Sequence, residues 1–229
     1  MAKYKGIVWS DARGKVNGLV YSRNTFGVYV RNLASPTQPR TPAQLNIRAI
    51  VQNLSRQWRN LTPAQRDGWN ALAAQVTLTD SLGNSYHPTG QQLFVGLNTN
   101  LSLIGASTIT NPPAAPVLVN TPTNVYVTAT GGTTPVLTVG WDGGDANLDA
   151  IIYATSTISA GRNFIRPSEF RIISNAGGAG APATSILSPW QQKYGPVPNP
   201  PAGKVAVGVK LIDSNTGFAG GFAYGVDTW

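Results

Sequence analysis

The sequence TPAQLNIRAIVQNLSRQWRNLTPAQRDGWNALAAQV, residues 41–76, decides the fold of the first half of the chain. Thr-Pro-Ala-Gln occurs in it twice, at residues 41–44 and 62–65. In each copy Thr suits a helix N-cap, Pro suits the first helical position, and Gln can close a capping box. Apolar residues follow both copies at helical spacing, so we expect a helical hairpin with two tryptophans in its core. These apolar residues are Ile47, Ile50, Val51, Leu54, Trp58 and Leu61 after the first copy, and Trp69, Leu72, Ala73 and Val76 after the second.

A third helix is predicted after Thr89, where Gln92 completes another capping box and Gly105 suits a C-cap. Its apolar positions are Leu93, Phe94, Leu97, Leu101 and Ile104. Residues 77–87 predict a small β-hairpin between the second and third helices.

Strand patterns precede the helices. Residues 6–9 form a short β-rich run, and residues 16–21 and 26–30 are rich in β-branched and aromatic side chains, which predicts a β-hairpin. Residues 32–40 contain two prolines and few apolar side chains, so we expect an extended arm there.

A proline-rich stretch at residues 111–116, Asn-Pro-Pro-Ala-Ala-Pro, separates two sequence patterns. Helical and strand patterns are mixed before it, whereas short strand patterns alone follow it. We therefore expect an α+β domain over residues 1–110, a linker over 111–116, and an all-β antiparallel sandwich over 117–229. The expected strands of the sandwich are 117–119, 124–129, 135–141, 149–155, 169–174, 204–212 and 221–228.

The positive charge is concentrated in the first half of the chain. Residues 1–110 hold 11 Lys and Arg and 3 Asp, a net charge of +8, whereas residues 111–229 hold six of each sign. This asymmetry predicts that the first half meets an anionic partner, such as nucleic acid, a membrane surface or an acidic protein surface. A solvated basic face is the alternative interpretation.

Arginines recur every eight to ten residues along the predicted strands, arm and first helix, interleaved with aromatic residues. Arg pairs in bidentate fashion with carboxylate and with phosphate, and a strand with apolar neighbours suits pairing with a partner sheet. We expect these residues to bind an acidic protein surface, with a phosphate backbone as the second choice. The candidate residues are Arg13, Arg23, Arg31, Arg40, Arg48, Arg56, Tyr21, Phe26 and Tyr29.

The sequence offers few groups for catalysis. It has no Cys, which excludes a disulfide framework, a thiol nucleophile and a Cys-ligated zinc site, and its single histidine is His87, beside Pro88. The nine acidic residues are scattered over turns. We therefore expect neither an enzyme nor a cofactor nor a small-molecule substrate. The sequence shows no apolar run long enough to cross a membrane and no signal peptide at its start.

One acidic turn has the residue types of a calcium site. Its four oxygen-bearing side chains are those of Asp142, Asp145, Asn147 and Asp149. Their spacing is not that of an EF-hand, and a turn between strands uses the same residue types. The turn is thus only a weak calcium candidate, and no metal site is predicted.

Residues 14–74 resemble a family of uncharacterised proteins encoded by phages and prophages. The resemblance rests on Gly14-Lys15-Val16, on Tyr29-Val30-Arg31, on Pro39-Arg40-Thr41 with Gln44, and on the run from Trp58 to Asn70. Residues 90–105 are also similar to that family, and the second half resembles it through an immunoglobulin- or fibronectin-III-like sandwich after a proline-rich stretch.

The resemblance implies a non-enzymatic structural component of a bacteriophage virion and carries over no catalytic residue. We expect a minor or decorating capsid protein, attached through its basic half to other virion proteins in several symmetric copies. It would be made in the host cytoplasm. A neck or tail structural protein, or a nucleic-acid-binding protein packaged with the genome, is the alternative.

Overall fold

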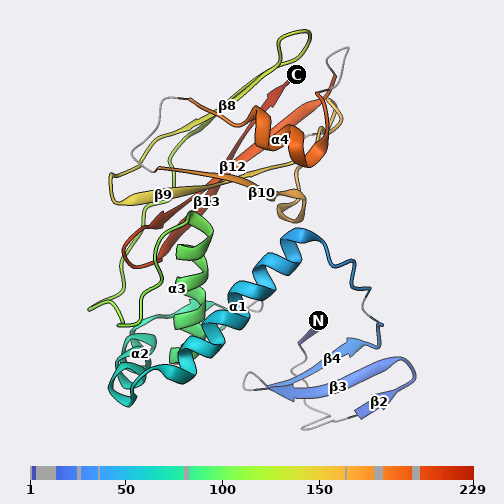
Figure 1. Ribbon diagram of the computed structural model, residues 1–229. Coiled ribbons are helices and arrows are strands. Elements are labelled where there is room, and N and C mark those ends of the chain that lie inside the picture. Colours follow the sequence, from blue (N-terminus) through green and yellow to red (C-terminus); the bar gives the residue numbers. More distant parts are fainter. Residues whose placement is uncertain are drawn as a thin grey trace. The chain divides into compact units, whose positions relative to one another are not determined.

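The computed structural model of the protein describes residues 2–3, 14–24, 27–35, 37–79, 83–162, 164–177, 183–197 and 202–229 (Figure 1). The chain forms two compact units. We call residues 1–48 and 78–86 the N-terminal unit, and residues 49–77 and 87–229 the C-terminal unit. The fold is α+β with antiparallel sheets, as expected.

The N-terminal unit contains a four-stranded antiparallel sheet in the order β1-β4-β3-β2 (Figure 1). Its strands are β1 (Ala2–Lys3), β2 (Gly14–Val16), β3 (Leu19–Asn24) and β4 (Gly27–Asn32). The predicted hairpin is confirmed as the β3–β4 pair, and Val16 belongs to β2 rather than to the same strand as Tyr21. The expected strand at residues 6–9 lies outside the described residues.

Asn17 and Gly18 connect β2 to β3, and both have positive φ angles, of 44° and 79°. Positive φ at both central residues is the requirement of a type I′ turn, which Asn-Gly meets with little strain. The Asn-Gly turn fixes the register in which Val16 pairs with Leu19.

The expected arm over residues 32–40 begins one residue later than expected, because Asn32 belongs to β4. Residues 33–35 and 37–41 have no regular secondary structure and are exposed. Leu33 N–H donates to Gly18 O at 2.6 Å, and the Arg48 guanidinium donates to Gln38 Oε1 at 2.7 Å. The small hairpin is also present, as β5 (Leu78–Thr79) paired with β6 (Ser85–Tyr86).

All three predicted helices are present. They are α1 (Pro42–Asn60), α2 (Pro63–Gln75) and α3 (Gly90–Ile104). Complete capping boxes join Thr62 to Gln65 and Thr89 to Gln92, and Gly105 ends α3 in the left-handed conformation. At the start of α1, Gln44 N–H donates to Thr41 Oγ1 at 3.4 Å.

The capping boxes predict a difference between two matched substitutions. We expect Thr62→Ala to lower the free energy of unfolding by about 0.5–2 kcal/mol, because the Gln65 N–H loses its acceptor. Thr41→Ala removes a similar hydrogen bond, of 3.4 Å against 3.3 Å at Thr62, whereas Thr62→Ala also removes the 3.2 Å contact between the Thr62 hydroxyl and Gln65 Oε1, so the effect at Thr41 should be smaller. Urea unfolding of both variants measures the difference, and equal losses would show that the α2 box contributes nothing extra.

The helices share a core built around Phe94 of α3. Trp69 and Phe94 are fully buried, and their rings meet edge to face with centroids 5.3 Å apart. Trp58, from α1, lies 5.5 Å from the same ring. Both tryptophans of the helical hairpin therefore pack on the third helix, which closes their core.

The segment after α3 is held against the helices by polar contacts. The buried amide of Asn98 donates to Phe94 O at 3.0 Å and to Ile109 O at 3.1 Å, and its oxygen accepts from Ile109 N–H at 2.7 Å. Trp69 Nε1 donates to Thr110 O at 2.9 Å. These hydrogen bonds thus hold Ile109 and Thr110, just before the proline-rich stretch, against α2 and α3.

Pro112, inside that stretch, continues this packing. A Cβ atom built on Gly68 of α2 would lie 2.9 Å from Pro112 Cγ, so the glycine allows the proline to approach. Gln65 Nε2 also donates to Asn111 Oδ1 at 2.8 Å. The start of the predicted linker is therefore packed on α2.

Asn98 should be the most sensitive polar residue of this region. Asn98→Ala leaves the half-buried N–H and C=O of Ile109 without their partner, and an unpaired group costs about 1–3 kcal/mol when it is buried. We expect a loss of about 2 kcal/mol or more in the free energy of unfolding. Asn53→Ala, at an exposed position of α1, is the control and should cause no loss. If Asn98→Ala lowers the free energy of unfolding no more than Asn53→Ala does, the hydrogen bonds of Asn98 do not stabilise this region.

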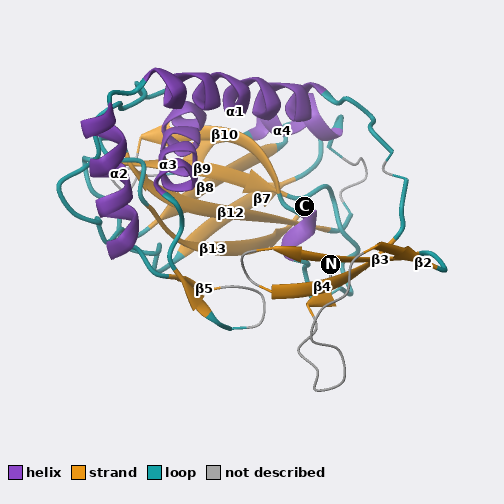
Figure 2. Cartoon of the chain, turned by 90° about the horizontal axis from the view of Figure 1, so that it is seen from below, coloured by secondary structure: helices purple, strands orange, loops and turns teal. Residues whose placement is uncertain are grey.

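The described residues of the C-terminal unit form seven antiparallel strands in two sheets (Figure 2). One sheet has the order β10-β9-β12-β13 and the other the order β11-β8-β7. The strands are β7 (Val125–Thr130), β8 (Val136–Trp141), β9 (Leu148–Ala154), β10 (Arg171–Gly177), β11 (Thr184–Ser185), β12 (Lys204–Asp213) and β13 (Ala219–Thr228).

The two sheets enclose one hydrophobic core. Alternate residues of β12, from Val205 to Leu211, are fully buried and pack with Leu137 and Val139 of β8. Ala206 and Ile212, on the other face of β12, are also fully buried, in two further clusters, so β12 is covered on both faces. The expected strand at residues 117–119 is not present, although Val119 is buried in this core.

The expectation of an all-β second half is wrong, because α4 (Leu187–Tyr194) lies between β11 and β12. Its Trp190 is buried in the core between the sheets and donates from Nε1 to Thr155 O at 2.9 Å. Leu187, Trp190 and Tyr194 have helical spacing, but this short pattern was not recognised among turn residues. A 3₁₀ turn, η1 (Pro167–Glu169), precedes β10.

Helix α3 also packs against the β10-β9-β12-β13 sheet (Figure 2). Its Leu101 and Ile104 form a buried cluster with Ile151 of β9 and Ile212 of β12. Asn100 Nδ2 donates to Gly217 O at 2.8 Å. The helices and both sheets therefore belong to one compact unit, whose limits differ from the expected division at residues 111–116. That residues 117–229 form a domain of their own stays a prediction.

Candidate partner-binding surface

The N-terminal unit carries most of the net charge. Residues 1–48 and 78–86 contain eight Lys and Arg and two Asp, a net charge of +6 out of +8 for the chain. The C-terminal unit is three times as long and carries the remaining +2. The anionic partner expected from the sequence would therefore be met chiefly by the N-terminal unit.

The register of the N-terminal sheet places two of the predicted arginines on opposite faces. Val20 of β3 stands opposite Arg31 of β4, whereas Arg23 of β3 stands opposite Val28. Residues directly opposite each other project from the same face, and neighbours along a strand alternate. Tyr29 and Arg31 therefore share one face, and Tyr21 and Arg23 share the other.

The face that carries Tyr21 and Arg23 is otherwise largely apolar. Val16 stands opposite Leu19, and Val30 opposite Tyr21, on this face. Val16 is 58% exposed and the other three are only half-buried. The buried hydrophobic clusters formed by the described residues all lie in the C-terminal unit. The described part of the sheet thus has an apolar face without a core, which a sheet normally buries against another layer.

The other candidate residues are spread beyond the sheet. Arg40 lies in the arm with φ of 51°, and Arg48 lies on the first turns of α1. Arg56 lies further along α1, in the C-terminal unit. Arg13 and Phe26 lie outside the described residues. The described candidates are therefore divided between the sheet, the arm and α1.

The acidic turn does not bring its four side chains together as ligands. Asp142 accepts hydrogen bonds from Asn124 Nδ2, at 2.9 Å, and from the hydroxyl of Tyr126. Asp149 lies in β9, where burial raises the pKa of its carboxyl, and Asn147 O accepts from Ser214. Among the described residues there is no group of three or more His, Cys, Asp or Glu that could hold a metal ion.

The contacts of Asp142 have a measurable consequence. The hydrogen bond from Tyr126, and then that from Asn124, hold the pKa of Asp142 below its ordinary value. Their stabilising effect is present above the ordinary carboxyl pKa and is lost as the pH falls through the lowered one. We expect Tyr126→Phe to raise the pKa of Asp142 toward its ordinary value, so that less stabilisation is present at neutral pH and its loss on acidification is complete at a higher pH. An NMR titration of the Asp142 carboxyl carbon measures the pKa, and Tyr224→Phe is the control. An unchanged pKa in Tyr126→Phe would show that the Tyr126 hydroxyl does not hydrogen-bond to Asp142.

A polar pocket of about 520 Å³ lies in the C-terminal unit, between the segment that follows β9, η1 and the end of α4. Its charged lining residues are Arg162, Glu169 and Arg171. Its hydroxyl-bearing lining residues are Ser156, Thr157, Ser159, Ser168 and Tyr194, and Ile158 is an apolar lining residue. Sequence reasoning missed this site because its lining residues come from separate segments between Ser156 and Tyr194, which come together only in the folded chain.

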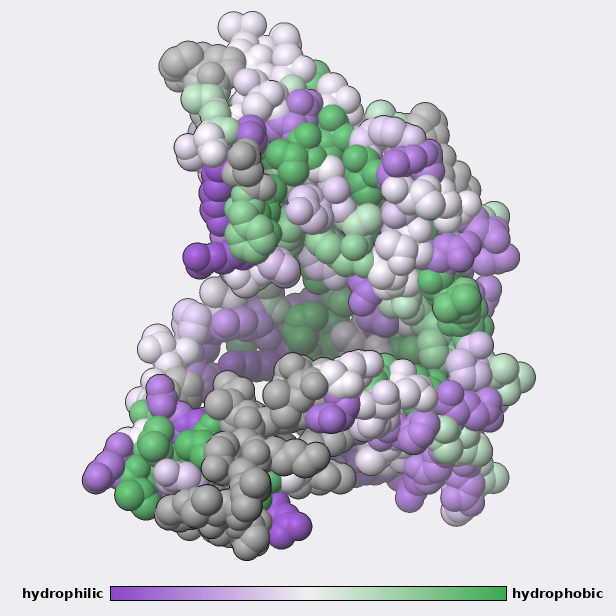
Figure 3. All heavy atoms as spheres, turned by 180° about the vertical axis from the view of Figure 1, so that it is seen from behind, coloured by the Kyte–Doolittle hydropathy of each residue, from purple (hydrophilic) through white to green (hydrophobic). Residues whose placement is uncertain are grey.

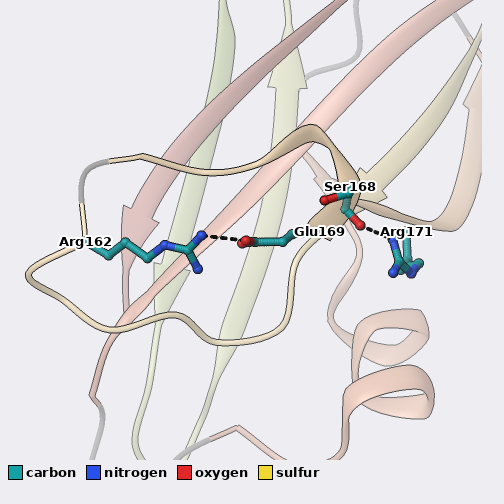
Figure 4. Close-up of polar contacts among 4 residues, drawn as sticks. All are labelled: Arg162, Ser168, Glu169 and Arg171. Carbon is teal, nitrogen blue, oxygen red and sulfur yellow. Dashed lines mark hydrogen bonds and ion pairs between the residues drawn. The ribbon is translucent and has the colours of Figure 1, made fainter. Parts of the chain in front are cut away.

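Figure 4 shows how the charged residues of the pocket are oriented. Arg162 and Glu169 point toward each other from two sides of a loop and form an ion pair with an N–O distance of 2.5 Å. Arg171 is turned instead to the backbone, where its Nη1 donates to the carbonyl oxygens of Ser168 and, at 3.0 Å, Phe170. The Glu169 carboxylate is thus paired with Arg162, and the guanidinium of Arg171 is held by two backbone carbonyl oxygens.

Apolar side chains also reach the surface of the C-terminal unit, among polar ones (Figure 3). On β13, Phe222, Tyr224 and Val226 project from one face and are 40–49% exposed. The ring of Phe222 lies over Gly208 of β12, where a Cβ atom would be 2.2 Å from the ring. The glycine therefore makes room for an aromatic side chain that covers the sheet.

None of the described helices is both long and apolar enough to cross a membrane. No protein-family model, curated protein or solved structure shows significant similarity to this chain.

Proposed function

We propose that the protein is a non-enzymatic structural component of a bacteriophage virion, a minor or decorating capsid protein attached through its basic N-terminal unit. The observation that carries the proposal is the combination found there: a net charge of +6 and a sheet whose apolar face has no core among the described residues. A surface that is both basic and apolar suits a partner protein with an acidic, partly apolar surface.

The form of the sheet suggests how the partner binds. β2 stands at one end of the strand order, and its residues Gly14, Lys15 and Val16 are all exposed. A strand at the end of a sheet can pair with a strand of another chain through its backbone. Lys15 would then pair with acidic side chains of the partner, which sets orientation and specificity.

The two-sheet domain supports a projecting or packing role. Labelled A, B, C, C′, E, F and G in chain order, strands β7 to β13 form one sheet with the order A-B-E and another with the order C′-C-F-G. In immunoglobulin-type sandwiches C, F and G likewise share one sheet, and A, B and E share the other. We propose an immunoglobulin- or fibronectin-III-like sandwich here, with α4 as an insertion between E and F.

Packaging with the genome is the second candidate, and the charge favours it. Proteins that read DNA commonly gather Lys and Arg on one helix face. Here Arg23 and Arg31 project from opposite faces of a sheet, and Arg40 lies in an arm. This spread suits a protein partner better than a phosphate backbone. A neck or tail position in the virion fits the same features.

Deletion of residues 1–40 tests the attachment. We expect the truncated protein to be lost from assembled particles, because it lacks the basic sheet and the arm. Arg23→Gln with Arg31→Gln should weaken incorporation, whereas Arg59→Gln with Arg166→Gln, the same loss of charge at exposed positions of the C-terminal unit, should leave it unchanged. Quantifying the protein in purified particles is the measurement, and normal incorporation after the deletion would refute the proposal.

Duplex DNA binding by the full chain separates the two candidates. A contact with six phosphates would lose about 10³-fold in affinity between 50 and 200 mM salt. We expect only weak binding to DNA at 200 mM salt. Tight binding with such a steep salt dependence would favour the packaged nucleic-acid-binding protein.

A further inference from the structure

We propose that the polar pocket of the C-terminal unit binds the carboxylate or phosphate group of a small hydroxylated ligand, and that Arg171 recognises its charge. The inference is independent of the virion role, because it concerns other residues in another unit.

The charge balance of the pocket favours an anion. Arg162 and Glu169 neutralise each other in their 2.5 Å ion pair. Arg171 forms no ion pair with any described residue, so it is the one uncompensated charge of the described lining. An anionic group that enters the pocket would therefore meet a net positive charge, with the Glu169 carboxylate already satisfied.

The guanidinium of Arg171 is held in place before a ligand arrives. Its Nη1 donates to the carbonyl oxygens of Ser168 and Phe170, and its hydrogen bonds to described residues all use that one nitrogen. Nη2 and Nε remain as donors, and Arg171 is exposed. Two parallel donors on a planar guanidinium match the two oxygens of a carboxylate or phosphate.

The remaining lining favours a hydroxylated ligand over a bare ion. Side chains of Ser156, Thr157 and Ser159 each offer a donor and an acceptor to ligand hydroxyls. The phenol of Tyr194 donates to Ala154 O at 2.8 Å, and burial raises its pKa, so it adds no negative charge at neutral pH. A volume of about 520 Å³ falls in the range of small-molecule pockets and far exceeds one ion.

Four probes test the proposal on the full chain by calorimetry: glucuronate, glucose 6-phosphate, glucose and inorganic phosphate. We expect at least one sugar acid to bind with Kd of about 1 mM or tighter, glucose not to bind, and phosphate to bind more weakly than glucose 6-phosphate. The tighter of the two sugar acids identifies the preferred anion. Absence of binding by both acids, binding of glucose as tight as theirs, or phosphate as tight as glucose 6-phosphate would overturn the proposal.

Matched substitutions assign the recognition to Arg171. Arg171→Gln should weaken binding of the sugar acid by about tenfold or more, the effect of losing a hydrogen-bonded charge. Arg166→Gln removes an exposed arginine of the same segment that does not line the pocket and should leave affinity unchanged. Arg171→Lys keeps the charge without the planar pair of donors and should cause an intermediate loss. Equal affinities in the three variants would overturn the assignment, and thermal melts establish that each is folded.

Discussion

The rest of the structure depends on the two-sided burial of α3. Its first half packs Phe94 against Trp69 and Trp58 of the helical hairpin. Its second half packs Leu101 and Ile104 against the sheet that contains β9 and β12. An amphipathic helix normally buries one stripe, whereas this helix must satisfy two cores along its length. The helical hairpin and the sheets are consequently parts of one unit, although a proline-rich stretch separates them in the sequence.

The two units differ in net charge and in the burial of their apolar residues. The C-terminal unit has buried clusters and a charge near balance, so its stability comes from its own core. The N-terminal unit has most of the positive charge and, in its described part, a sheet with half-exposed apolar residues. A sheet in this state is stabilised by a further layer. That need is why we propose that the protein attaches to its partner through the N-terminal unit.

The candidate sites show what spacing alone can and cannot predict. The recurrence of arginine every eight to ten residues is visible in the sequence. Whether two arginines share a face depends on strand register, and the register sends Arg23 and Arg31 to opposite faces. The pocket around Arg171 was not predicted, because its lining comes from a loop, a 3₁₀ turn and the end of a helix. Such a set has no periodicity or motif.

Local signals determined the helices and most strands. The capping residues Thr62 and Thr89 and the left-handed Gly105 act within one helical turn, so the sequence alone specified where α2 and α3 begin and where α3 ends. Tertiary structure decided the helix around Trp190, since burial of that ring between the sheets stabilises eight residues that are too short to be helical alone. It also decided the limits of the two units. Those limits depend on contacts between α3 and strands more than 40 residues away, which no local pattern records.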